Sequence, residues 1–346
     1  MSEIIKVALD AMGGDDAPGV IIEGCMQALH MSQDVFIYLV GDEKIIGPML
    51  ERESYDKERL EVVNASEVIT NNDHPVLAIK QKKDSSMVVA LKLVREGKAQ
   101  AFISAGSTGA ILVGGQVIVG RDKGVLRPAL APLMPTLQGF SLLIDCGANV
   151  DARPEHLVQY ARMGSIYYEN TMKKASPTVA ILNIGAEEEK GNALVRAAYP
   201  LLKECSDINF IGSIEARDIP YGKADIIVCE AFAGNIVLKM YEGTANALFS
   251  KIKGAFMANF KTKIAALMLK SQLKKTLKDY DSTDYGGAPM LGLKRLVVKA
   301  HGSCSAKEFR QAILQCLSFY RADVSGKIAA AIAAAREKES LQEEEQ

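Results

Sequence analysis

The chain has 346 residues, of which 48% are hydrophobic and 24% are charged, and its formal net charge is −1. This composition excludes an intrinsically disordered chain, and the small net charge excludes a general electrostatic attraction to nucleic acid. The cysteines at positions 25, 146, 205, 229, 304 and 316 form no Cys-x-x-Cys pair. Their spacing argues against a zinc site or a disulfide framework and indicates a reducing compartment.

The first residues lead directly into an apolar run at positions 5–9, without the layout of a signal peptide. No later run approaches the roughly 20 uninterrupted apolar residues of a membrane-spanning helix. Together with the cysteine content, these features predict a cytoplasmic protein.

Short apolar runs alternate with helix-like segments along the chain. Strands are expected at 5–9, 35–40, 62–63, 101–105, 141–144, 178–183, 209–211 and 225–229, with a further apolar run at 296–298. Helices are expected at about 20–30, after Pro75, at 86–96, from Pro154 and at 327–335. Nearly continuous apolar strands between helices indicate an α/β protein with a mostly parallel, doubly wound sheet. We expect one catalytic domain over 1–335 and an acidic tail over 336–346.

Polar, glycine-containing turns follow the first strand and the strand at 101–105. The first turn, at 10–15, reads D-A-M-G-G-D, and the second, at 105–110, reads A-G-S-T-G-A. Adjacent glycines let backbone N–H groups converge on an anion, and the small hydroxyl residues of the second turn suit a phosphate or carbonyl group. The alternatives are helix caps, by Asp15 or Asp16 in the first turn and by Ser or Thr in the second. Neither turn matches a dinucleotide or P-loop fingerprint.

The most polar turn, at 145–156, reads D-C-G-A-N-V-D-A-R-P-E-H. The carboxyl end of a parallel strand is where open α/β folds bind ligands. Taken alone, this turn suggests an acid–base site with His156 as the catalyst. Pro154 stands where the first turn of a helix accepts it.

Two further strand ends carry single candidates. Lys190 follows three acidic residues in N-I-G-A-E-E-E-K-G-N at 183–192, as an anion clamp held by Glu187 or Glu188, or as an ordinary surface charge. Asn235 either hydrogen-bonds a substrate oxygen or caps a helix together with Gly234. The sequence has no G-x-S-x-G elbow, no local Cys–His signature and no metal-ligand cluster. We therefore expect no metal and no cofactor.

As an ordered set, these turns, together with G-N-I-V-L-K at 234–239, closely resemble the bacterial phosphate acyltransferase family, from about residue 4 to about residue 325. The resemblance implies transfer of a fatty acyl group from acyl-[acyl carrier protein] to inorganic phosphate, which gives acyl-phosphate for phosphatidic acid and phospholipid synthesis. It also implies a three-layer α/β/α sandwich, related to isopropylmalate dehydrogenases and phosphate acetyltransferases. The implied enzyme is a homodimer, lies peripherally on the inner face of the cell membrane and supplies a glycerol-3-phosphate acyltransferase.

The mechanism expected from these residues is direct acyl transfer. Phosphate is already anionic, so it needs orientation more than deprotonation. The candidate catalytic residues are Lys190 and Asn235 as phosphate ligands, Asn149 as an oxyanion donor, and His156, which we interpret as an organiser of the turn. The candidate substrate-binding residues are Asp10, Gly13, Gly14, Asp15, Gly106, Ser107, Thr108, Gly109, Asp145, Gly147, Asp151, Arg153 and Gly185. Among these, Asp145 and Asp151 are expected to position other groups.

Residues 251–278 contain eight lysines and no acidic residue, with apolar residues at largely helical spacing. We expect an amphipathic helical protrusion at about 245–280. Such a segment suits an anionic lipid surface or an acidic carrier protein, and its plain alternative is a solvated face or a dimer seam. The candidate contacts are Lys251, Lys261, Lys263, Lys270 and Lys274.

Three other functions remain as alternatives. A phosphotransacylase that uses acyl-coenzyme A has the same chemistry with a different thioester. A decarboxylating dehydrogenase with NAD and Mg²⁺ is disfavoured, because no D-x-x-x-D pattern and no cofactor fingerprint occur. A membrane-surface scaffold would bind carrier protein without catalysis.

Overall fold

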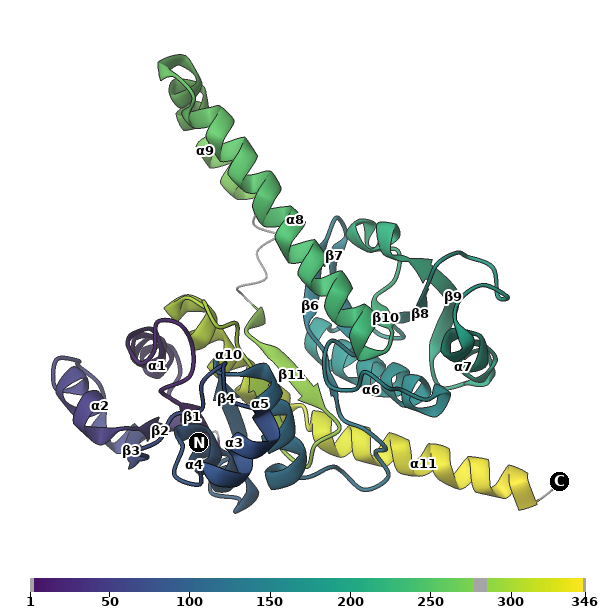
Figure 1. Ribbon diagram of the computed structural model, residues 1–346, viewed down its shortest axis with the longest axis horizontal. Coiled ribbons are helices and arrows are strands. Elements are labelled where there is room, and N and C mark those ends of the chain that lie inside the picture. Colours follow the sequence, from purple (N-terminus) through teal and green to yellow (C-terminus); the bar gives the residue numbers. More distant parts are fainter. Residues whose placement is uncertain (1–2, 277–284, 345–346) are drawn as a thin grey trace.

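The computed structural model describes residues 3–276 and 285–344 (Figure 1). In this part of the chain the strands form two sheets. The first has the order β3-β2-β1-β4-β12-β11-β5, with β1 at Ile5–Asp10, β2 at Val35–Gly41, β3 at Leu60–Asn64, β4 at Ala101–Ser104, β5 at Ala129–Leu130, β11 at Ala288–Leu291 and β12 at Leu296–Lys299. Neighbours from β3 to β12 run parallel, whereas β11 runs antiparallel to both β12 and β5.

The second sheet has the order β6-β7-β10-β8-β9. Its strands are β6 at Leu133–Thr136, β7 at Gly139–Ile144, β8 at Thr178–Asn183, β9 at Asn209–Glu215 and β10 at Ile226–Val228. Only β6 runs antiparallel to its neighbour among the described strands of this sheet. The carboxyl ends of β7, β10 and β8 therefore lie next to one another.

Helices cover both sheets on both faces, because alternate residues of each strand point to opposite sides. In the first sheet, Val7 and Leu9 join the core beneath α1 (Gly19–Met31) and α10 (Ala306–Arg321), whereas Ala8 joins the core beneath α4 (Ser86–Arg95). In the second sheet, α6 (Pro154–Met172) and α7 (Ala193–Glu204) cover one face, and the start of α8 (Ala231–Met257) lies against the other. The expected α/β fold with helices on both faces of mostly parallel sheets is confirmed.

One continuous buried cluster joins the two sheets. It contains Leu9 of β1, Ile144 of β7 and Phe309 of α10, together with Tyr160 and Tyr167 of α6. The last helix, α11 (Val324–Glu344), packs along α6. The sequence places a helix only as far as Ala335, but the observed helix continues through Glu344. The remaining helices are α2 at Glu43–Leu50, α3 at Pro75–Gln81, α5 at Thr108–Gly114 and α9 at Phe260–Thr276.

A helical hairpin projects from the body of the protein. Figure 1 shows α8 extending well beyond both sheets and α9 folding back against its outer part. The insertion expected at 245–280 corresponds to the outer part of α8 and to α9, and its last residues lie outside the described part of the chain. Within residues 3–276 and 285–344, no helix combines the length and the hydrophobicity that crossing a bilayer requires.

Candidate active site

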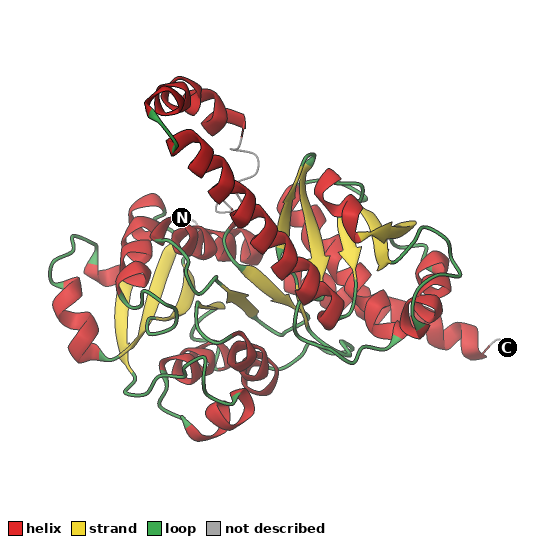
Figure 2. Ribbon diagram, turned by 45° about the horizontal axis from the view of Figure 1, so that its top comes forward, coloured by secondary structure: helices red, strands yellow, loops and turns green. Residues whose placement is uncertain are grey.

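The turns singled out in the sequence gather at the carboxyl edges of the two sheets. In the first sheet, β4 lies between β1 and β12, with Ile103 beside Leu9 and Ser104 beside Lys299. The turns at 10–15, 104–109 and 299–303 are therefore neighbours. In the second sheet, β10 lies between β7 and β8, so the turns at 145–151, 229–235 and 183–192 are neighbours as well. Figure 2 shows the two groups of strands, with α8 leaving from the second group.

The turn after β7 connects the two edges. The carboxylate of Asp145 accepts hydrogen bonds from Leu130 N at 3.0 Å, Ala148 N at 3.0 Å, Asn149 N at 2.9 Å and Asn149 Nδ2 at 2.8 Å. Leu130 belongs to the first sheet, and Ala148 packs on the core of that sheet. Asp145 is fully buried, and burial raises its pKa despite these donors. All of these contacts are internal, so this carboxylate holds the turn in place.

Asn149 has a different role from the oxyanion donor that the sequence suggested. Its side-chain amide donates to Asp145 Oδ2 at 2.8 Å and to Pro128 O at 2.7 Å, so both of its N–H bonds are already used. The side chain is buried. Asn149 is therefore a positioning residue, because it has no donor to spare for a developing oxyanion.

His156 closes the first turn of α6. Its Nδ1 accepts a hydrogen bond from Arg153 N at 3.0 Å, and the side chain is 4% exposed. Burial, followed by the positive charges of Arg153 and Arg127, lowers the pKa of His156. A neutral imidazole that accepts a backbone N–H is an organiser of the turn and not the catalyst that the isolated motif suggested. Asp151 and the side chain of Arg153 are exposed beside it, and Gly147 has a positive φ of 139°.

Asp10 was expected to contact substrate, but it is buried at the end of β1. Its carboxylate accepts hydrogen bonds from Ser86 Oγ and Ser104 Oγ, each at 2.6 Å, and from Met12 N at 3.2 Å. A Cβ at Gly13 would lie 2.5 Å from Asp10 Oδ2 and 2.8 Å from Gly106 N. Only glycine therefore allows the turns after β1 and β4 to pack this closely, and Asp10 is a positioning residue.

The other residues at the carboxyl edge of the first sheet make fewer hydrogen bonds within the protein than Asp10 does. Gly106 N donates to Ser104 Oγ at 2.9 Å, and Asp15 N donates to Gly302 O at 2.8 Å beside Gly14. Ser107 precedes α5 without a side-chain capping bond, and α1 follows Pro18 without one. Ser107 is therefore the N-cap residue of α5 by position but not through its side chain, whereas the interpretation of Asp15 or Asp16 as the cap of α1 is wrong, because Pro18 holds that position. Thr108 is exposed, and Gly109 lies against Pro75.

Lys190 presents its ammonium group at the second edge. Its Nζ lies 2.9 Å from Glu187 Oε1, whereas Glu188 pairs with Lys203 at 2.7 Å. Both side chains of the first pair are about half exposed, and the hydrogen bond from Lys190 lowers the pKa of Glu187. A Cβ at Gly185 would lie 2.6 Å from Lys190 Cδ. The glycine therefore leaves room for the lysine to fold over the end of β8.

Asn235 lies in the first turns of α8, where Glu230 is the capping residue. The carboxylate of Glu230 accepts a hydrogen bond from Ala233 N at 3.0 Å, so the interpretation of Asn235 as the cap is wrong. Asn235 is exposed, and no hydrogen bond from its side-chain amide occurs within the described part of the chain. This amide is available to a substrate.

Lys299 is not among the residues predicted from the sequence, although it belongs to the carboxyl edge of the first sheet. Lys299 ends β12 and lies beside Ser104 of β4. The available signal was a single lysine directly after an apolar run, at a strand end that a glycine follows at position 302. That signal is weak, because most lysines at strand ends are solvated.

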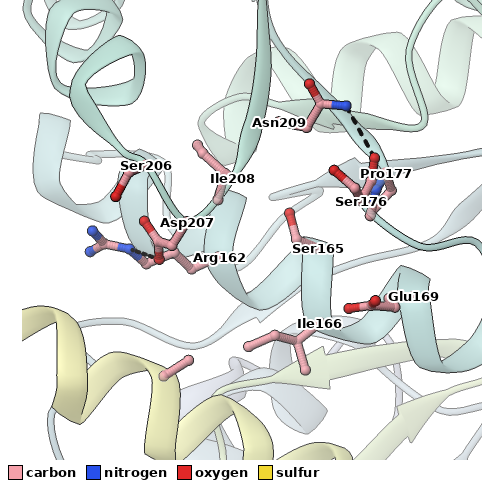
Figure 3. A pocket seen from close by; sticks show the side chains of 11 residues that line it. Arg162, Ser165, Ile166, Glu169, Ser176, Pro177, Ser206, Asp207, Ile208 and Asn209 are labelled. Carbon is pink, nitrogen blue, oxygen red and sulfur yellow. Dashed lines mark hydrogen bonds and ion pairs between the residues drawn. The ribbon is translucent and has the colours of Figure 1, made fainter.

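Two cavities lie away from these turns. One of about 470 Å³ lies between α6, α11 and the amino ends of β8 and β9, where Arg162 pairs with Asp207 and Asn209 binds Ser176 (Figure 3). Another, of about 530 Å³, lies between α6 and α10. Neither contains any of the turns described above. The polar groups at the strand ends, and not a cavity, therefore define the candidate site.

Known proteins resemble the chain over nearly its whole length. The family model described as "Fatty acid synthesis protein" matches residues 5–327. A phosphate acyltransferase of Clostridium novyi is 48% identical over 94% of this chain and 97% of its own length. One from Clostridium botulinum is 51% identical over 91% and 93%, respectively.

Solved structures share the fold at low sequence identity. The EutD phosphotransacetylase from Staphylococcus aureus has a TM-score of 0.58 at 17% identity, and a phosphotransacetylase from Streptococcus pyogenes has 0.59 at 15%. In both cases the match covers 92% of this chain and 94% of the other. The sequence identities to the curated relatives show more than a shared fold: the chain belongs to the phosphate acyltransferase family.

Proposed function

We propose that the protein transfers a fatty acyl group from acyl-[acyl carrier protein] to inorganic phosphate and releases acyl-phosphate for phospholipid synthesis. The observation that carries this proposal is the exposed ammonium of Lys190 at the end of β8, beside the turn that presents Asn235. A cation held only by an exposed carboxylate can exchange that partner for a phosphate oxygen at little cost. Family membership supports the acyl transfer to phosphate.

The proposed chemistry needs no covalent enzyme intermediate. A phosphate oxygen attacks the thioester carbonyl, a C–O bond forms, the C–S bond breaks, and the proton of the phosphate is passed to the departing thiolate. Lys190 and Asn235 orient the phosphate. The hydrogen bonds of Asp10 and Asp145 fix the positions of the turns at the carboxyl edges of the two sheets. Because a thiolate leaves readily, most of the acceleration comes from positioning.

The helical hairpin supports the proposed peripheral contact with a membrane. One face of α9 carries Phe260, Ile264, Leu267 and Met268, which follow one another at intervals of four, three and one positions. Phe260, Leu267 and Met268 are 76%, 72% and 78% exposed. By their helical positions, Lys261 flanks one side of this face, and Lys263 and Lys270 flank the other. An apolar centre with cationic borders suits an anionic lipid surface. The apolar residues of α8 and α9 are also the proposed seam of a homodimer.

The test is formation of acyl-phosphate, trapped with hydroxylamine, from acyl-[acyl carrier protein] and inorganic phosphate. Lys190→Ala should lower kcat/KM by at least about 100-fold, because it removes a charge that orients the attacking group. Lys203→Ala, which removes the neighbouring pair with Glu188, is the matched control and should stay near the wild-type value. Near-normal turnover by Lys190→Ala would exclude the clamp.

The thioester itself is tested in the same assay. Acyl-coenzyme A replaces the carrier-bound substrate at equal concentration, and the proposal expects the carrier-bound thioester to react with the higher kcat/KM. A preference for acyl-coenzyme A would identify the protein as a phosphotransacylase of the alternative kind. Flotation with vesicles but no phosphate-dependent loss of thioester would identify a scaffold.

A further inference from the structure

The ammonium group of Lys299 lies at the carboxyl edge of the first sheet. Its Nζ lies 3.5 Å from Ala105 O and also contacts Ala300 O. Ala105 begins the A-G-S-T-G-A turn, and Lys299 is paired in register with Ser104. The side chain is therefore held against the turn that contains Ser107 and Thr108, by backbone carbonyls and by its strand.

This lysine is partly buried and makes no direct ion pair within the described part of the chain. No ion pair joins its Nζ to a carboxylate of residues 3–276 or 285–344, and burial lowers its pKa to about 8. The charged or titratable groups that face it are Lys239 and Glu242 of α8, Asp15 after β1 and Cys304 before α10. Lys239 and Glu242 already pair with each other at 2.8 Å, so their charges largely cancel.

The same neighbours locate Lys299 relative to the second edge. Lys239 and Glu242 lie in the first half of α8, the helix that begins at the end of β10 and carries Asn235. Two of the charges that act on Lys299 therefore belong to the element that presents Asn235. A partly buried cation with no direct ion pair, and with Asp15 as its one uncancelled carboxylate neighbour, still favours an added anion, because few water molecules screen its charge.

We propose that Lys299 is a second substrate-binding cation of this site and contacts the attacking inorganic phosphate from the first edge, as Lys190 does from the second. The inference rests on the proposed function. Phosphate is the substrate that this chemistry selects, because it carries between one and two negative charges at neutral pH, whereas the thioester carbonyl carries none. The protonated lysine binds phosphate, and its neutral form does not.

The test is a set of steady-state measurements from pH 6.5 to 9.5, in which KM for phosphate and KM for the acyl thioester are determined separately. Lys299→Met should raise KM for phosphate roughly tenfold or more at pH 7 and leave KM for the thioester unchanged. In the wild type, KM for phosphate should rise as the pH passes about 8, because Lys299 loses its proton there. In Lys299→Arg this rise should be absent, because the guanidinium remains charged.

Lys294→Met is the matched control, since Lys294 is an exposed lysine between β11 and β12 at the other end of the same hairpin. It should keep the wild-type KM for phosphate. An unchanged KM for phosphate in Lys299→Met, or a wild-type pH dependence in Lys299→Arg, overturns the inference. A buried structural lysine would not produce a pH-dependent phosphate KM that arginine abolishes.

Calorimetric titration with inorganic phosphate alone separates this inference from the proposed function. It uses the intact chain and needs no turnover. Wild-type binding that weakens above pH 8, with no weakening in Lys299→Arg, supports the inference even if no acyl-phosphate is formed. If acyl-phosphate forms but substitutions at Lys299 leave phosphate binding unchanged, the proposed function is supported and the inference is refuted.

Discussion

Asp145 and Lys190 show how differently two charged residues at one sheet edge are used. Asp145 is buried and saturated with donors from both sheets, whereas Lys190 is half exposed and shares its charge with one exposed carboxylate. A buried and saturated group defines the geometry of the backbone around it. An exposed group with one weak partner can exchange that partner for substrate. The same division separates Asp10 from Asn235.

Replacement of Asp145 by Asn should destabilise the fold by about 2–4 kcal/mol. The amide would turn an N–H donor toward the N–H groups of Leu130, Ala148 or Asn149 and leave at least one of them unsatisfied. Urea denaturation followed by circular dichroism measures the change. Asp151→Asn, at an exposed position in the same turn, should change stability by less than about 0.5 kcal/mol. Equal stability of the two variants would show that the buried carboxylate does not hold this turn.

Helix α6 begins with a reciprocal cap between Arg153 and His156, which makes the histidine part of the helix start. Glutamine is a usual residue at this third helical position, because its side-chain oxygen accepts the same backbone N–H. His156→Gln should therefore keep kcat within about twofold of wild type and the stability within about 1.5 kcal/mol.

His156→Leu is the complementary variant, because it fills the space but offers no acceptor. It should lose roughly 1 kcal/mol or more of stability, measured by thermal unfolding. A loss of rate of about 100-fold or more in a stable His156→Gln protein would instead assign proton transfer to the imidazole.

The elements show what could be predicted from sequence. Strands with uninterrupted apolar runs, such as residues 178–183 and 225–229, were predicted close to their observed bounds. β5, β6 and β11 were missed because they have only two to four residues, and β6 and β11 contain Pro135 and Pro289. Their antiparallel pairing depends on partners distant in the chain.

The sequence locates the turns that meet at the carboxyl ends of the strands, but it does not show which of their polar atoms are already engaged within the protein. Asn149 is engaged by Pro128 and His156 by Arg153. The separation of Asn149 and Pro128 in the sequence does not predict their contact. That contact depends on the position of β5, which follows Pro128 directly. Lys299 was missed for a related reason, since its burial depends on the turn after β4. Strand ends are local properties of a sequence, whereas the availability of a polar atom depends on tertiary contacts.

At the scale of the whole molecule, the two proposed tasks of the hairpin would lie at its opposite ends. Its inner end, at the start of α8, presents Asn235, and its outer end presents Phe260, Leu267 and Met268. The double change Leu267→Ser and Met268→Ser should strongly weaken flotation of the protein with vesicles that contain anionic lipid, because it removes two of the four residues of the exposed apolar face. The rate in solution with acyl-[acyl carrier protein] should stay near wild type.

Charge reversal at Lys270, Lys274 and Lys275 distinguishes lipid from carrier protein. A membrane surface predicts lost flotation and an unchanged rate in solution, whereas docking of the acidic carrier predicts a higher KM for the carrier-bound thioester. Flotation that survives both sets of substitutions would contradict the membrane role of α9. Sedimentation of the double apolar variant reports in the same preparation whether these residues also hold a dimer together.

The length of α8 has a consequence for the delivery of product. A helix of 27 residues extends about 40 Å, so a hairpin standing upright on a bilayer would keep the reacting groups roughly that far from the lipid. An acyl-phosphate released there would have to carry its hydrocarbon chain through water, which is unfavourable by about 0.8 kcal/mol for each exposed methylene. A hairpin lying along the surface removes this gap. Fluorescence quenching by lipid-attached probes at the tip and near the start of α8 would measure the tilt, and thus how far the product travels.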